Sequence, residues 1–291
     1  MKIKKSIILI IAILIFSNIN SCMVEAKTKE NFVVNARNAI AIDSQTGEVL
    51  FEKNAYEIVP MASTTKILTA LITIERMDLK EKFIVSKNAA SVRGSKVGYK
   101  AGDEIAIKEL LYGLMYRSGN DAAITLAEGM GGSIEGFAEI MNDYGKSLGL
   151  LDSHFQSPHG LDMAEHYSSA YDLAILTKKG MEYDIFREIV GTKAITKETN
   201  NFTRDYNNIN KILWKIPGAN GVKTGYTGQA GKCLVSSIDY NGRDVIIVVL
   251  NCPDRWNVTE KIFKYIQETV AFQGDIVDEL AKNKNRYNHH A

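Results

Sequence analysis

The chain has 291 residues, of which 45% are hydrophobic and 24% are charged, and its formal net charge is +1. This is the composition of an ordinary globular protein with enough apolar residues for a core. The near-neutral balance predicts neither a strongly basic nor a strongly acidic face, so nucleic acid is not expected as a partner.

The N-terminus has the pattern of a secretion signal. A lysine-rich start is followed by an uninterrupted apolar run at residues 7–16, and Ala26 ends a V-x-A cleavage pattern. The run is long enough for a signal core and too short for a comfortable membrane span. We therefore expect residues 1–26 to be a signal peptide and the protein to be exported. An uncleaved anchor and a buried apolar helix are the alternatives.

The predicted elements start with strands. Residues 39–43 and 48–53 read as two strands of a hairpin around a turn at residues 44–47. Pro60 then breaks the chain, and apolar residues at helical spacing predict a helix over residues 63–76.

The middle of the chain is predicted to be helical and its end to return to strands. An Asn241-Gly242 hairpin turn joins the last two strands, and a polar tail at residues 273–291 is expected to fray. The predicted helices are 107–116, 122–130, 134–148, 169–179 and 258–272, and the predicted strands are 233–238 and 244–250.

This order of elements predicts the architecture. Strands from both ends of the sequence can pair in one antiparallel sheet, while the helical middle forms a second lobe with a cleft between them. We expect an α/β (α+β) fold, with an antiparallel β-sheet flanked by helices and a helical lobe, in one domain over residues 27–272.

Cysteines contribute little to this prediction. Cys22 lies in the signal region, and Cys233 and Cys252 lie in or next to strand-like segments. Two cysteines cannot form a disulfide scaffold, so the plain expectation is two buried small side chains, with a pairing between them left open.

The first polar motif is S-x-x-K at Ser63 and Lys66. Residues three apart share one face of a helix, so the lysine should lie beside the hydroxyl. Serine needs a base to become a nucleophile, and lysine can act as that base only when burial or a nearby cation lowers its pKa. A helix cap followed by a surface lysine would give the same pattern.

The second motif is S-x-N at Ser118 and Asn120, at a tip between two predicted helices. A tip suits a hydroxyl and an amide that point into a cleft, although a helix cap would look the same. Ser86 and Asn88 form a competing S-x-N. The later motif is preferred because a helix lies on each side of it.

The third motif is K-T-G at Lys223, Thr224 and Gly225, leading into the C-terminal strands. A strand that carries lysine and threonine beside a cleft can hold a substrate carboxylate, and glycine allows close approach of a substrate backbone. An exposed edge strand with a solvated lysine is the alternative. Together, however, the three motifs stand in the order typical of penicillin-binding proteins and serine β-lactamases.

Longer segments carry a more specific resemblance. The sequence resembles the low-molecular-mass penicillin-binding proteins that act as D-alanyl-D-alanine carboxypeptidases, over roughly residues 35–272. The resemblance implies a fold like that of β-lactamases and penicillin-binding proteins. The segments that carry it are 61–66, 114–123, 157–162, 166–170 and 217–227.

The resemblance also implies roles for the motif residues. Ser63 would attack the carbonyl between the two terminal D-alanines of a peptidoglycan stem peptide, Lys66 would take its proton, and Ser118 would relay that proton to the leaving D-alanine. Asn120 would bind a substrate amide. No cofactor and no metal are expected.

The third motif would then bind the end of the substrate. The resemblance implies that Lys223 and Thr224 hold the terminal carboxylate beside Gly225, and that the N–H groups of Ser63 and Tyr226 form an oxyanion hole. β-Lactams would acylate the same serine as inhibitors, at the extracellular or periplasmic face of a bacterial envelope.

Anchoring to the membrane stays open. Many members of this family carry a C-terminal β-rich domain and a helix that lies on the membrane. Residues 273–291 are too few for that domain, so anchoring by this route is not expected.

Four other functional classes are alternatives to a D-alanyl-D-alanine carboxypeptidase. A class A β-lactamase needs a glutamate in an E-x-x-L-N setting, which does not occur between Ser118 and Lys223. His154, His159 and His166 lack the spacing of a zinc peptidase. A Ser-His-Asp hydrolase would need a G-x-S-x-G elbow, which is absent. A non-catalytic penicillin-binding sensor stays open.

Overall fold

The computed structural model describes residues 32–270, and the elements below belong to the unit that begins at Asn35. The predicted signal peptide at residues 1–26, which includes Cys22, lies outside the described residues. So do the predicted tail at 273–291 and the predicted domain limits at 27 and 272.

An antiparallel sheet of five strands forms one layer of the described residues. Its order is β2-β1-β9-β8-β7, so a strand from the start of the chain pairs with one from the end, with Ala39 opposite Val249. This confirms the predicted pairing of the two ends. The strands are β1 Asn38–Asp43, β2 Val49–Lys53, β7 Ala219–Thr227, β8 Gly231–Tyr240 and β9 Arg243–Leu250.

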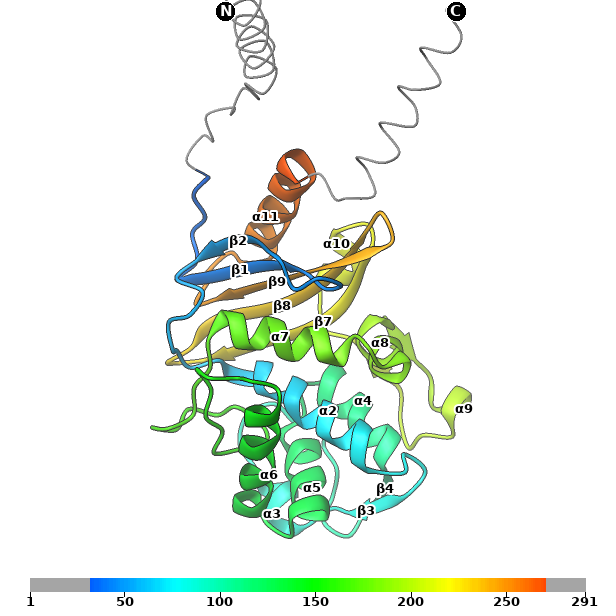
Figure 1. Cartoon of the computed structure of the whole chain (residues 1–291). Helices are drawn as coiled ribbons and strands as arrows, with labels where there is room; N and C mark the ends of the chain where they lie inside the picture. Colours follow the sequence, from blue (N-terminus) through cyan, green and yellow to red (C-terminus); the bar gives the residue numbers. More distant parts are fainter. Residues whose placement is uncertain (1–31, 271–291) are drawn as a thin grey trace, which may run out of the picture. The chain divides into compact units, whose positions relative to one another are not determined.

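Helices cover both faces of this sheet. α7 (Ala170–Gly180) lies against β1 and β9, while α11 (Arg255–Thr269) packs on β8 and β9 from the other side (Figure 1). Strand β9 is therefore buried along residues 244–250, as its continuous apolar sequence predicts. The turn before it is the predicted Asn-Gly hairpin, with positive φ at Asn241 (55°) and Gly242 (76°).

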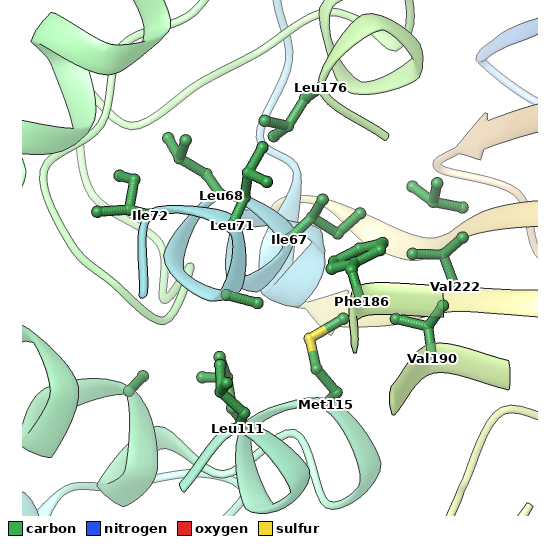
Figure 2. Packing of buried hydrophobic residues seen from close by; sticks show 14 of the residues in the cluster. Ile67, Leu68, Leu71, Ile72, Leu111, Met115, Leu176, Phe186, Val190 and Val222 are labelled. Atoms are coloured by element: carbon green, nitrogen blue, oxygen red, sulfur yellow. The ribbon is translucent and has the colours of Figure 1, made fainter. Parts of the chain in front are cut away.

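A helical lobe surrounds α2. This helix is buried along residues 66–73, as expected of a helix in contact with neighbours on all sides. Figure 2 shows Ile67 of α2 in the same packed cluster as Phe186 and Val222, which come from α8 and β7. The helices of this lobe are α2 Lys66–Arg76, α3 Lys87–Ser91, α4 Ile107–Tyr116, α5 Asn120–Gly131, α6 Ile134–Ser147 and α8 Asp184–Gly191.

The start of α2 differs from the prediction. The expected single helix over residues 63–76 is divided into a 3-10 turn, η1 Ala62–Thr65, and α2 itself. Ala62 enters the turn with a φ of 51°, a left-handed conformation that residues with a Cβ rarely adopt. Ser63 thus lies in the tight turn that directly precedes α2.

Several short elements were not predicted. Each is too short for a hydrophobic period to be visible in the sequence. They are α3, β3 Lys82–Ile84 paired with β4 Glu104–Ala106, β5 Ala194–Ile195 paired with β6 Tyr206–Asn207, α9 Lys197–Asn200 and α10 Ile212–Lys215. The longer helix α8 was not predicted either. No helix within residues 32–270 has both the length and the apolar character needed to cross a bilayer.

Candidate active site

The S-x-x-K pair is in contact. The Lys66 Nζ lies 3.0 Å from the Ser63 Oγ, and the lysine is completely buried whereas Ser63 is partly exposed. The 3-10 turn brings the hydroxyl over the first residue of α2, so a residue separation of three still places the two groups together.

Two further acceptors surround the same amine. The Lys66 Nζ donates to the Asn120 Oδ1 at 2.8 Å and to the main-chain oxygen of His159 at 2.7 Å. The Ser63 hydroxyl also lies 3.4 Å from this His159 oxygen. The first two motifs therefore meet at Lys66, together with residue 159 of the 157–162 segment.

The electrostatic surroundings favour an uncharged Lys66. Burial holds its pKa well below the ordinary value, the positive charge of Lys223 lowers this pKa further, and Asp121 opposes the shift. The effect of Lys223 also means that the third motif lies within electrostatic reach of the first.

Ser118 and Asn120 lie at the tip between α4 and α5, as predicted. Ser118 is 5% exposed and has a φ of 55°, and Asn120 begins α5. The Asn120 Nδ2 donates to the main-chain oxygen of Arg93 at 2.8 Å, so both ends of this amide have protein partners. In the described part of the chain the Ser118 hydroxyl forms no hydrogen bond with Ser63 or Lys66.

Asp121 links this tip to a neighbouring loop through hydrogen bonds. Its carboxylate accepts hydrogen bonds from the backbone N–H groups of Val97, Gly98 and Tyr99, and it is buried. The backbone N–H of Asn120 donates to the Ser95 oxygen at 2.8 Å. The segment at residues 93–99 is thereby fastened to the start of α5, which the sequence did not indicate.

The competing S-x-N has a structural role. The Ser86 Oγ accepts from the Ala89 N–H and caps α3. The Asn88 side chain donates to Glu128 at 2.9 Å. Neither residue contacts Ser63 or Lys66, in keeping with the preference for the later motif.

The third motif lies on β7, against the turn that carries Ser63. A Cβ on Gly225 would come within 3.2 Å of the Ser63 backbone nitrogen, so the glycine permits this close approach. Lys223 and Thr224 are buried, whereas Tyr226 is 68% exposed. The Lys223 Nζ donates to the Thr224 oxygen at 2.9 Å.

Arg255 was missed by the sequence reasoning. From the start of α11 it donates to the Gly225 oxygen at 2.6 Å and to the Cys233 oxygen at 2.9 Å. Burial and then the charge of Arg255 lower the pKa of Lys223 to about 7. A single arginine far from the K-T-G motif gives no local signal, so only the fold connects the two.

The histidine and cysteine side chains bear on the zinc-peptidase and disulfide alternatives. Within residues 32–270 no group of three or more potential metal ligands is gathered. Burial lowers the pKa of His159 to about 3 and that of His166 to about 4. Cys233 and Cys252 are free and buried, and burial raises the pKa of each thiol to about 11.

Comparison with known proteins agrees with the resemblance found in the sequence. A family model described as D-alanyl-D-alanine carboxypeptidase matches residues 24–254. The carboxypeptidase DacF of Bacillus subtilis is 38% identical, over 77% of this chain and 59% of that protein. For DacC of Escherichia coli the identity is 37%, over 82% of this chain and 63% of that protein. The chain thus spans about three fifths of the length of these two curated relatives.

A solved structure extends the likeness to the fold. The Streptomyces K15 DD-transpeptidase superimposes with a TM-score of 0.76 and 31% identity, over 81% of this chain and 98% of that one. This similarity and the mixed sheet-and-helix architecture confirm the predicted fold class.

Proposed function

Because the chain belongs to the D-alanyl-D-alanine carboxypeptidase family, we propose that it is a serine-type carboxypeptidase that removes the terminal D-alanine from peptidoglycan stem peptides. The reaction proceeds through an acyl-enzyme on Ser63. β-Lactams resemble the D-Ala-D-Ala end and acylate the same hydroxyl.

The contact between Lys66 and Ser63 is the observation that carries this proposal. A neutral amine has two N–H groups and one lone pair. Its two N–H groups suit the oxygens of Asn120 and His159, at 2.8 and 2.7 Å. The lone pair is then left for the Ser63 hydroxyl at 3.0 Å, which is the arrangement of a base beside its nucleophile.

The chemical steps follow from this arrangement. The Ser63 Oγ attacks the carbonyl carbon between the two D-alanines while its proton passes to the Lys66 Nζ. The carbon–nitrogen bond then breaks, and the proton reaches the leaving amine by way of Ser118. The burial of Ser118 beside Asn120 supports this relay. Water finally hydrolyses the ester on Ser63.

Two backbone N–H groups stabilise the tetrahedral intermediate. We assign the oxyanion hole to Ser63 and Tyr226, and the close approach of Gly225 to the Ser63 nitrogen supports this assignment. Removal of one such donor typically costs about 10²–10³ in rate.

The substrate carboxylate binds at Lys223 and Thr224. In support, Lys223 is buried on β7 and the side chain has a single backbone acceptor, so it retains donors for an anion. Asn120 binds a substrate amide, for which its oxygen keeps a second lone pair beside the one used by Lys66.

The protein acts outside the cytoplasmic membrane, where peptidoglycan is found. The basic start, the apolar run at residues 7–16 and the cleavage pattern ending at Ala26 support export. The enzyme then acts at the extracellular or periplasmic face of the bacterial envelope.

Release of D-alanine from diacetyl-Lys-D-Ala-D-Ala tests the proposal. We expect release by the wild type, none by Ser63→Ala, and wild-type release by Ser147→Ala, which removes an exposed hydroxyl at the end of α6. Radiolabelled penicillin should stay bound to the wild type for minutes. Rapid penicillin turnover would instead indicate a β-lactamase, and stable labelling without peptide release would indicate a sensor.

A further inference from the structure

A buried histidine lies against the turn that carries Ser63. His166, 4% exposed, comes from the segment between α6 and α7, and its Nε2 lies 2.9 Å from the Thr65 Oγ1. Thr65 is the last residue of η1 and directly precedes Lys66. His166 therefore touches the backbone turn that connects the hydroxyl with the amine.

The hydrogen bonds around the His166 ring determine which ring nitrogen carries the proton. The His166 Nδ1 accepts from the Gln156 N–H at 3.0 Å. Since burial keeps the ring neutral, its proton sits on Nε2 and is donated to Thr65. The Thr65 hydroxyl in turn donates to the Ala62 oxygen at 2.8 Å. A chain of two bonds thus runs from His166 to the residue before Ser63.

This chain ends at the residue in the turn whose conformation is costly. A non-glycine residue in the left-handed region, such as Ala62 at φ 51°, costs on the order of 1 kcal/mol and persists only where its surroundings hold it. The carbonyl of Ala62 is also closely covered, because a Cβ on Gly160 would lie 1.9 Å from its oxygen.

The same segment also contacts the start of α2. The Pro158 oxygen accepts from Thr69 at 2.7 Å, and the His159 oxygen accepts from Lys66 at 2.7 Å. The Phe155 ring meets the His166 ring edge-on at 6.0 Å between centroids, which limits rotation of the imidazole. The segment between α6 and α7 therefore contacts both η1 and the start of α2.

We propose that His166 is a positioning residue for the nucleophile: acting through Thr65, it fixes the Ala62–Lys66 turn and thereby the contact between the Ser63 Oγ and the Lys66 Nζ. The inference rests on the proposed function for its catalytic meaning. It does not require His166 to touch the substrate or to change its charge.

Two amide substitutions separate positioning from packing. The amide of His166→Gln reaches the place of Nε2 and can still donate to Thr65. The shorter amide of His166→Asn replaces only Nδ1 and loses Thr65 while keeping an acceptor for Gln156. Thr65→Val removes the link while keeping the shape of the side chain. His154→Asn is the matched control, because His154 lies in the same segment but bonds to the Glu165 oxygen.

The rate constant of acylation by benzylpenicillin is measured separately from the dissociation constant of the non-covalent complex. We expect His166→Asn and Thr65→Val to lower the acylation rate constant about 10- to 100-fold, with the dissociation constant unchanged, because small misplacement of a nucleophile is costly. His166→Gln and His154→Asn should stay near the wild type. Equal losses in the Gln and Asn variants, or no loss in Asn and Val, would overturn the proposal.

Hydrogen exchange of the peptide spanning residues 61–66 gives a second readout that needs no activity. His166→Asn and Thr65→Val should exchange about tenfold faster there, while His166→Gln and His154→Asn should not. If the wild type is never acylated, the proposed function fails, and this exchange pattern still decides whether His166 holds the turn. Unchanged exchange in His166→Asn would refute it.

Discussion

The two buried lysines come from different parts of the molecule and have different surroundings. Lys66, at the start of α2, has three oxygen partners within 3.0 Å: those of Ser63, Asn120 and His159. Lys223, on β7 of the sheet, donates to one acceptor, the Thr224 oxygen. The helical lobe thus presents an amine whose partners are already assembled, while the sheet presents one with donors left for a ligand.

Burial and neighbouring charge act on both amines, with different consequences. The pKa of Lys66 is held well below its ordinary value, whereas that of Lys223 is lowered to about 7. A bound carboxylate would favour the charged form of Lys223. This difference supports the proposed roles of Lys66 as proton acceptor and of Lys223 as anion-binding residue.

Replacement of Lys66 should have the largest effect. Lys66→Met removes the proposed base, and we expect acylation by penicillin to slow about 10²–10⁴-fold. Lys66→Arg should be no better, because a guanidinium stays protonated. Stopped-flow acylation measures both, with Lys146→Met on the exposed face of α6 as the control. Near-wild-type acylation in Lys66→Arg would show that this position need not be neutral.

The pairing of strands from the two ends of the chain in one antiparallel sheet, and most of the long helices, could be predicted from the sequence. The apolar run of β9 and the Asn-Gly turn before it are local signals, and the structure confirms both. The start of α2 was harder, because the left-handed Ala62 depends on the Gly160 segment, which lies far along the chain. Local pattern cannot reveal a conformation that tertiary contacts impose.

In the site, too, the residues marked by local motifs could be predicted, and the contacts created by the fold could not. The side chains of the three motifs could be proposed from their residue types and order, and the structure brings Ser63, Lys66 and Asn120 into contact. The resemblance singles out residues 157–162, but the His159 partner of Lys66 is a main-chain oxygen, which every residue has, so the pattern does not reveal this contact. Arg255 approaches β7 only because α11 packs on the sheet.

Replacement of Lys223 should have the next largest effect, and of a different kind. Lys223→Met removes the proposed charged donor to the substrate carboxylate, and such bonds contribute about 1.5–3 kcal/mol. We expect kcat/KM for the peptide to fall about 10- to 100-fold, mainly through KM. Thermal stability should stay equal or rise, because a buried amine without a carboxylate partner is replaced by an apolar chain.

Steady-state kinetics with the diacetyl peptide, together with a thermal melt, measure both quantities. A loss in kcat with unchanged KM would show that Lys223 acts in the chemical step and not in substrate binding. That result would contradict the proposed contrast with Lys66.

The pH profile should separate the two amines further. Proton loss from Lys223 near its pKa of about 7 should lower kcat/KM on the alkaline side, and neutralisation of Lys66 should set the acid side. Lys223→Arg keeps its charge and should move the alkaline limb upward. An alkaline limb unchanged in Lys223→Arg would assign it to another group.

The same shift has a consequence for stability. Between pH about 7 and 10.5 the unfolded chain keeps a proton on Lys223 that the folded chain has lost. The free energy of unfolding should therefore gain a contribution that rises with pH across this window. In Lys223→Met this contribution should disappear, which denaturant titrations at several pH values can measure.

Gly225→Ala should have the smallest effect. The added Cβ would lie 3.1 Å from the Ala62 Cβ and 3.2 Å from the Ser63 nitrogen, so β7 and η1 must separate by a few tenths of an ångström. We expect acylation to slow about tenfold or less. Gly228→Ala, where an added Cβ has nothing within 4 Å, is the matched control. Equal rates in the two variants would show that the site tolerates separation of sheet and turn.

The most direct test is to locate the penicillin adduct on the folded protein. The wild type is incubated with benzylpenicillin, digested, and the modified residue is identified by peptide mass spectrometry. The expected result is one adduct on Ser63, absent in Ser63→Ala and formed much more slowly in Lys66→Met. An adduct on another residue, or equal labelling of Ser63→Ala, would contradict a nucleophile activated by the buried amine.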